Sequence, residues 1–126
     1  MALEHEQLTE KIIGAAIEVH RRLGPGFLES IYEKALIIEL RKRGLRVKSQ
    51  MEIIIDYDGQ EVGRHILDLL IEDTIIVELK AIKNLEDIHF AVARSYLRAV
   101  NKEHGLMLNF AKVTLEVRRV ICQRGH

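Results

Sequence analysis

The chain has 126 residues, 48% hydrophobic and 30% charged, a balance that indicates a globular protein and excludes a disordered one. Lysine plus arginine and aspartate plus glutamate each total 19, so the formal net charge is zero. This neutrality argues against a general nucleic-acid coat protein, whose affinity depends on neutralising phosphates. It is compatible with an enzyme whose acidic site is offset by basic patches elsewhere.

Cysteine content and hydropathy set the expected compartment. The single cysteine, Cys122, cannot form an internal disulfide and fits a reducing cytoplasm. No apolar run approaches the roughly 18 residues that a membrane helix needs. Residues 1–6 lack the basic and apolar regions of a signal peptide. We therefore expect a cytoplasmic protein without membrane association.

Two helices are expected first along the chain. Apolar residues recur with helical spacing over residues 8–22, and the Gly-Pro-Gly segment 24–26 ends that pattern. A second helical pattern covers residues 28–43, and Gly44 occupies the position of a C-terminal glycine cap.

The rest of the chain predicts a sheet interrupted by one helix. An Asp-Gly pair at 58–59 is a strong hairpin signal between the first two strands. The expected strands, with the third helix at 85–100, cover residues 45–57, 61–71, 75–82, 106–110 and 113–122. The order is ααβββαββ. We expect an α/β (α+β) fold with helices flanking a mixed central sheet, and one domain over residues 1–126.

Two acids and a lysine interrupt the aliphatic strand segments. Strand alternation places Asp68 on the face of Ile66 and Leu70, and puts Glu78 and Lys80 together on one face. Charged side chains among aliphatic residues are costly to bury without a partner. These three residues are therefore candidates for a functional site.

The turn between the second and third strands brings the two acids together. If Ile71 pairs with Ile75, then Asp68 lies opposite Glu78. Directly opposed carboxylates are destabilising unless a cation lies between them or one takes up a proton. A divalent ion with Lys80 beside it fits this pattern, which predicts a metal-dependent hydrolytic site.

The second helix carries a misplaced glutamate. On a helical wheel Glu29 falls between Leu36 and Leu40, beside Tyr32. Periodicity favours a first-turn acid that stabilises the helix dipole and still reaches water. An active-site role is the alternative. Tyr32 is expected at the boundary of the core, with its hydroxyl near solvent.

Basic residues gather on two helices. One run closes the second helix, where cations favour the dipole, and another group follows one face of the third helix. Each is either a solvated helix surface or a contact to the phosphate backbone. The candidate nucleic-acid contacts are Tyr32, Arg41, Lys42, Arg43, Arg94 and Arg98.

Several motifs resemble one known family. Residues 26–32, Gly-Phe-Leu-Glu-Ser-Ile-Tyr, match the motif that names the GxxExxY proteins, and further matches lie at 68–73, 77–81, 95–97 and 105–110. The chain therefore resembles this family over nearly its whole length. The family is a compact branch of the PD-(D/E)xK nuclease superfamily, whose core is a helix, three strands, a helix and a strand.

The resemblance implies a role for each site residue. Asp68 and Glu78 would bind Mg²⁺ or Mn²⁺, with the Leu79 carbonyl as a further ligand. Lys80 would orient the attacking water or stabilise the transition state. Glu29 would be the helix acid and a possible ligand. Magnesium prefers oxygen ligands and lowers the pKa of bound water, so the implied reaction is hydrolysis of DNA or RNA.

One departure keeps alternatives open. Family members commonly carry a glutamine four residues before Tyr96, where this chain has Val92. Valine cannot hold the lysine, a water or a phosphate, and Arg94 and His89 have different wheel positions. A non-catalytic module that binds nucleic acid or a protein partner is therefore the second hypothesis, and a purely structural ion network is the third. A partner or a homo-oligomer would supply specificity that so small a domain lacks.

Overall fold

A computed structural model describes residues 5–123 and has the expected order ααβββαββ. The segment without a signal-peptide pattern falls partly outside this range, since residues 1–4 are not described. The elements are α1 (His5–Leu23), α2 (Glu29–Lys42), β1 (Val47–Tyr57), β2 (Gln60–Ile71), β3 (Ile75–Lys80), α3 (Asp87–Ala99), β4 (His104–Asn109) and β5 (Glu116–Ile121). Within this range no helix is long and apolar enough to cross a bilayer.

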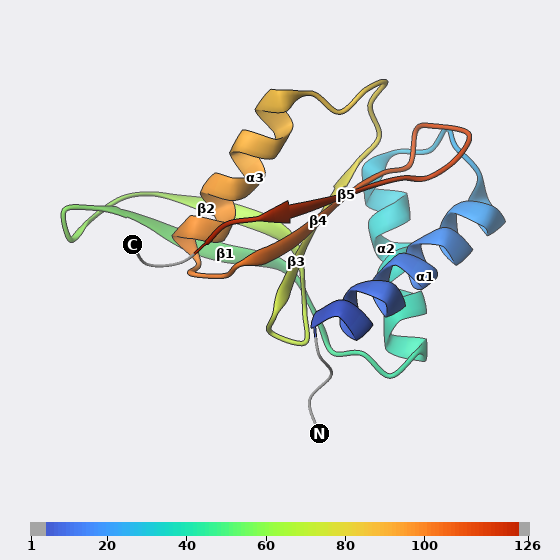
Figure 1. Ribbon diagram of the computed structural model, residues 1–126, viewed down its shortest axis with the longest axis horizontal. Helices are drawn as coiled ribbons and strands as arrows, with labels where there is room; N and C mark the ends of the chain where they lie inside the picture. The colour runs from blue at the N-terminus through green and yellow to red at the C-terminus, as the bar shows by residue number, and fades with distance from the viewer. Residues whose placement is uncertain (1–4, 124–126) are drawn as a thin grey trace.

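The five strands form one mixed sheet in the order β1-β2-β3-β4-β5. Three of the four pairings are antiparallel, and β3–β4 is parallel because α3 carries the chain across between them. Helices α1 and α2 cover one face and α3 covers the other (Figure 1). The fold is the expected α+β arrangement with a mixed sheet flanked by helices.

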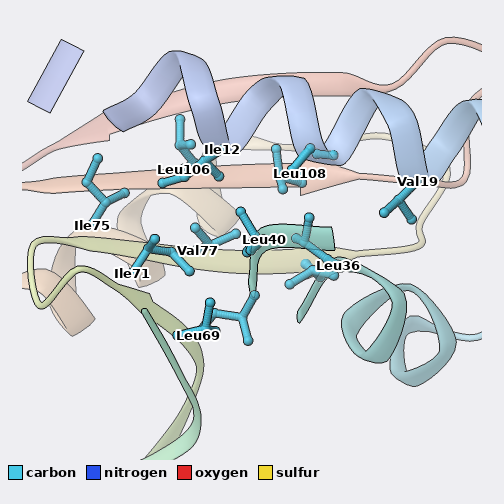
Figure 2. Close-up of a cluster of buried hydrophobic side chains, with 14 of the residues drawn as sticks. Ile12, Val19, Leu36, Leu40, Leu69, Ile71, Ile75, Val77, Leu106 and Leu108 are labelled. Atoms are coloured by element: carbon cyan, nitrogen blue, oxygen red, sulfur yellow. The ribbon is translucent and has the colours of Figure 1, made fainter. Parts of the chain in front are cut away.

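The larger core lies between the α1–α2 layer and the sheet. Helix α1 forms because its apolar residues recur three and four positions apart, which gives one buried stripe. Figure 2 shows side chains of both helices meeting those of three strands. The labelled residues are Ile12, Val19, Leu36, Leu40, Leu69, Ile71, Ile75, Val77, Leu106 and Leu108.

A smaller core lies under α3. Ala93 and Leu97 of this helix pack with Leu70, Ile76 and Met107 of the sheet. With α3 on this face and α1–α2 on the other, β3 and the last residues of β2 are covered on both sides, which explains the nearly continuous aliphatic sequence there.

Strand β2 changes face at Asp68. Leu67 and Leu70, three residues apart, both pack in the α3 core, whereas Leu69 between them packs in the α1–α2 core. The expectation that Ile66, Asp68 and Leu70 share a face is therefore wrong: Ile66 is 50% exposed and Leu70 is 2% exposed. The strict two-residue alternation fails where the β1–β2 ladder skips the pair of Asp68 with Gln50, whose φ is 51°.

The β1–β2 hairpin closes with the predicted turn. Asp58 and Gly59 have φ values of 52° and 77°, as a type I′ turn requires, and Tyr57 pairs with Gln60. The hairpin extends beyond β3, which has 6 residues against 11 and 12 in β1 and β2 (Figure 1).

Candidate active site

The β2–β3 ladder ends beside the predicted acids. Its three pairs, Ile71–Ile75, Leu70–Ile76 and Leu69–Val77, have the register that the turn predicted. Pairing does not continue to Asp68 and Glu78, although β3 goes on pairing with β4 as far as Lys80. We call the opening bounded by Asp68, Glu78 and Leu79 the β2–β3 gap.

Side chains replace the missing ladder bonds across this gap. The backbone N–H of Asp68 donates to Oε2 of Glu78 at 3.3 Å. The backbone N–H of Leu79 donates to Oδ2 of Asp68 at 2.9 Å. Each acid therefore satisfies a main-chain donor of the opposite strand, and the two carboxyl groups are held together.

Burial makes this pair of carboxyl groups electrostatically costly. Glu78 is only 8% exposed. Its burial, followed by its hydrogen bond to the Asp68 side chain and repulsion from that carboxylate, raises the pKa of Glu78 to about 9. The backbone N–H of Asp68 and the charge of Lys80 lower this pKa. Without a cation the pair therefore shares a proton at neutral pH, one of the two outcomes expected for opposed acids.

The Leu79 carbonyl also faces the gap. In a β-strand the N–H and C=O of one residue point to the same side, and the Leu79 N–H points to Asp68 on β2. The alternate groups of β3 point to β4, where the Phe110 N–H donates to the Lys80 carbonyl at 2.9 Å. The Leu79 carbonyl thus opens into the gap beside the two carboxylates.

These oxygens suit a hard divalent cation. Two carboxylates and one carbonyl match the preference of Mg²⁺, which keeps several waters and completes its coordination with substrate oxygens. Among residues 5–123, no three His, Cys, Asp or Glu side chains converge to hold an ion by themselves. The site therefore fits a partly hydrated ion rather than one enclosed by protein ligands.

A pocket of about 130 Å³ adjoins the gap on the α3 side. The site pocket is lined by Glu78, Lys80, His89, Val92, Ala93, Tyr96 and Met107. Lys80 is half-buried there, on the same strand face as Glu78. The pocket thus places one ammonium group beside the carboxyl pair.

The sequence of this chain matches one family of known proteins. A family model of the PD-(D/E)XK nuclease superfamily matches residues 6–120. The chain belongs to the PD-(D/E)XK nuclease superfamily. No curated protein sequence matches the chain.

One solved structure similar to this superfamily member is the crystal structure of SSO0001. It is 16% identical in sequence, with a TM-score of 0.60 over 76% of this chain. At this low identity the likeness concerns the fold alone. This chain spans 50% of the length of that one.

Val92 lines the site pocket at the position where the resemblance to the GxxExxY proteins implied a glutamine, and His89 lines it one helical turn earlier. The backbone N–H of Glu86 donates to Nδ1 of His89 at 2.8 Å. A neutral imidazole with Nδ1 as acceptor carries its hydrogen on Nε2. His89 therefore brings a donor group to the pocket, whereas Arg94 is exposed and does not line it.

Tyr96 also lines the site pocket, and no role was expected for it from the sequence. Burial, and then the charges of Glu78 and Asp68, raise its pKa. Its ring stacks on His65, with centroids 4.1 Å apart. The signal for Tyr96 was its place in the family-like segment 95–97, whereas no pattern in the sequence predicted its stack on His65.

Glu29 does not lie among leucines as the helical wheel suggested. It is the first residue of α2 and is exposed, whereas Leu36 and Leu40 are fully buried. The wheel ignores distance along the axis, and these leucines lie about two and three turns further on. The structure instead brings Glu33, one turn after Glu29, into contact with Gln50, at 2.9 and 3.0 Å. The sequence analysis missed this pair.

Tyr32 is a structural residue, so its expected contact with nucleic acid and its expected boundary position are both wrong. It is fully buried, with its ring stacked on Phe110 at 4.5 Å between centroids. Its hydroxyl donates to the Gly24 carbonyl at 2.6 Å and accepts from the Phe27 N–H at 3.1 Å. Tyr32 thereby anchors the loop before α2, whose short turn needs an internal partner for these backbone groups.

The basic run at the end of α2 has partners within the fold. Arg41 donates to the Val47 carbonyl at 3.0 Å, and Lys42 and Arg43 pair with Glu39 at 3.5 and 2.9 Å. The run also lies about two turns beyond Glu33 along the helix. The solvated helix end therefore accounts for it.

The basic residues of α3 face away from the site. Arg94 and Arg98 are both exposed, and neither lines the site pocket. On the helix they lie opposite Val92 and Tyr96, which do. The structure does not bring these arginines to the Asp68–Glu78 pair.

A buried asparagine holds the chain just beyond Lys80. Asn109 is fully buried, and its side chain accepts from the Ile82 N–H at 3.1 Å and donates to the Ile82 carbonyl at 2.8 Å. It also accepts from Ala111 N–H and donates to Glu116, at 3.2 Å each. All four hydrogen-bonding positions of the amide are used. This fixes the end of β3 and with it the backbone of Lys80.

Proposed function

We propose that this protein is a Mg²⁺- or Mn²⁺-dependent nuclease that hydrolyses phosphodiester bonds of DNA or RNA. The observation that carries the proposal is the Asp68–Glu78 pair, held in a gap of the sheet beside Lys80, in a member of the PD-(D/E)XK nuclease superfamily. The GxxExxY branch is the subfamily that its motifs support. A single free cysteine fits work in a reducing cytoplasm.

The site residues divide between holding the ion and handling the phosphate. Asp68, Glu78 and the Leu79 carbonyl supply the ion's protein oxygens. When bound, the ion lowers the pKa of a coordinated water and stabilises negative charge on the phosphate. Lys80 orients that water and offsets charge on the phosphate oxygens. The hydroxyl of Tyr96 and Nε2 of His89 add polar groups at the pocket where valine replaces the expected glutamine.

A nuclease-like module that binds nucleic acid without cutting it is the second candidate. Val92, Ala93 and Met107 give the pocket an apolar lining next to Glu78 and Lys80. An apolar group at the Val92 position removes a hydrogen-bonding partner for a water or phosphate. This candidate predicts nucleic-acid binding that needs little metal and leaves the strand intact.

The first experiment is calorimetric titration of Mn²⁺ into the native protein and into Asp68→Asn. Asparagine keeps an oxygen for the Leu79 N–H, so the variant preserves the fold while losing the charge. Asp56→Asn, an exposed acid of β1, is the matched control. We expect saturable binding that only Asp68→Asn abolishes.

Cleavage of labelled single- and double-stranded DNA and RNA then separates the two candidates. Metal-dependent cutting that Glu78→Gln removes supports the nuclease and excludes the inert module. Undiminished cutting by Glu78→Gln contradicts the assigned site. Substrates that stay intact over long incubation with Mn²⁺ favour the module.

A further inference from the structure

Gln50 adopts an unusual backbone conformation directly across β1–β2 from Asp68. Its φ is 51°, in the left-handed region that non-glycine residues rarely enter. The other non-glycine residues with positive φ within residues 5–123 lie in turns, whereas Gln50 lies inside a strand. The pairs on either side of it are Ser49–Leu69 and Met51–Leu67.

Packing does not explain this conformation, because Gln50 is exposed. Its amide nitrogen instead reaches α2 and donates to both carboxylate oxygens of Glu33, at 2.9 and 3.0 Å. Strained backbone persists only where its surroundings hold it, and such residues cluster at functional sites. The residue with the strained backbone is thus the one that contacts Glu33.

Two acids, Glu29 and Glu33, lie in the first two turns of α2. Glu33 is half-buried, whereas Glu29, one turn earlier, is exposed. Burial, followed by repulsion from Asp68 and then from Glu29, raises the pKa of Glu33, and the Gln50 amide lowers it. Gln50, which holds the Glu33 carboxylate, lies across β1–β2 from Asp68, so this contact connects α2 with the strand position of a proposed metal ligand.

We propose that Glu33 is the α2 carboxylate of the metal site and that Gln50 is the positioning residue that holds it there. Glu33 is not part of a convergent group of three acids, so it accepts hydrogen bonds from water on the ion rather than binding the ion directly. Gln50 leaves the remaining lone pairs of the carboxylate open to such waters. This inference rests on the proposed function, since it requires an ion at Asp68 and Glu78.

Mn²⁺ affinity measured by calorimetry, without nucleic acid, tests the assignment. Loss of an outer-shell partner typically weakens metal binding by about 10-fold or more. We expect Glu33→Gln and Gln50→Ala each to weaken Mn²⁺ binding about 10-fold, and Glu29→Gln to weaken it less. Glu10→Gln, an exposed acid of α1, is the remote control.

Gln50→Gly separates positioning from folding. Glycine tolerates positive φ, so this variant relieves the strain while removing the amide. We expect its melting temperature in EDTA to equal or exceed that of Gln50→Ala, with Mn²⁺ binding weakened as in Gln50→Ala. If Gln50 served only the local backbone conformation of β1, its replacement by glycine would cause no loss of Mn²⁺ affinity.

The outcomes separate a failure of the roles assigned to Glu33 and Gln50 from a failure of the proposed metal site. If Asp68→Asn abolishes binding but Glu33→Gln and Gln50→Gly bind like the native protein, the inference is overturned and the nuclease site stands. A larger loss from Glu29→Gln than from Glu33→Gln also overturns it. If the native protein binds no Mn²⁺, or Asp68→Asn binds normally, the proposed metal site fails and the role of Glu33 fails with it.

Discussion

Glu78 accepts a hydrogen bond from the backbone N–H of Asp68 at 3.3 Å, where the next pair of the β2–β3 ladder would otherwise form. The carboxyl group of Glu78, which takes the place of a ladder bond here, is also a proposed metal ligand. Because it is buried next to a second acid, the metal-free fold keeps it protonated at neutral pH. Fold stability and metal binding thus depend on the same proton.

The metal-free protein should lose stability as pH rises. The pKa of Glu78 is near 4.5 when unfolded and about 9 when folded, so between these values the folded state binds more protons. The free energy of unfolding therefore falls with increasing pH, by at most about 1.4 kcal/mol per unit from this group. Thermal unfolding in EDTA from pH 5 to pH 9 measures this slope.

Glu78→Gln is the control for that slope, because it removes the titrating group and keeps the side chain's size. Burial, and then the charge of His5, lower the pKa of His104, so this group makes the free energy of unfolding rise with pH below pH 6.5. Both proteins contain His104, so its contribution cancels when the stability of the variant is subtracted from that of the native protein. The native-minus-variant stability should fall steadily across the range. A difference that is flat with pH would contradict the buried, protonated state.

Mn²⁺ should stabilise the protein, and by more at higher pH. An ion binds the ionised carboxylates and must displace the shared proton, which is easier as pH rises. A ligand at about 100 times its dissociation constant adds about 2.7 kcal/mol to the free energy of unfolding. The melting temperature with and without about 1 mM Mn²⁺, at pH 6 and pH 8, checks this. Equal shifts at both values would count against proton displacement.

His89→Ala should lower cleavage about 10- to 100-fold, the range typical of losing a positioned proton-handling or polar group. Its hydrogen bond from Glu86 also supports the start of α3, so about 1 kcal/mol of stability is lost as well. Asp87→Asn weakens the same helix start without altering the pocket. If both variants cut equally well, His89 serves the helix only.

Tyr32→Phe should destabilise the fold by about 1–3 kcal/mol and leave nucleic-acid affinity unchanged. The change removes the partner of the Gly24 carbonyl and the Phe27 N–H, and unsatisfied buried polar groups carry a cost of that size. Urea unfolding and a binding titration on the same preparation separate the two effects. Weaker binding at unchanged stability would restore Tyr32 as a contact residue.

Local patterns predicted the elements because they depend on spacing along the chain. Helical periodicity, the Asp58-Gly59 turn and the three-residue turn before Ile75 gave both the order of elements and the β2–β3 register. The convergence of Asp68 and Glu78 followed from that register. The end of the ladder beside them did not, because there the side chains of Asp68 and Glu78 take the place of the next ladder bonds.

Contacts between distant segments could not be predicted in this way. Glu33 and Gln50 are 17 residues apart, and their bond needs a backbone conformation that no sequence preference for glutamine suggests. Tyr32 gave a pattern typical of a boundary residue, but the loop carbonyl it binds and the Phe110 ring it stacks on come together only in the folded chain. The pocket role of His89 likewise depends on how α3 lies over the sheet.

The two amides that border the gap have a consequence for spectroscopy. The N–H groups of Asp68 and Leu79 donate to carboxylate oxygens that an ion would also use. Metal binding should therefore change the protection of these two amides from hydrogen exchange. The residues Leu69 and Val77, which pair in the β2–β3 ladder, should keep their protection. Hydrogen–deuterium exchange at Asp68 and Leu79 reports metal occupancy directly, without any substrate or assay of turnover.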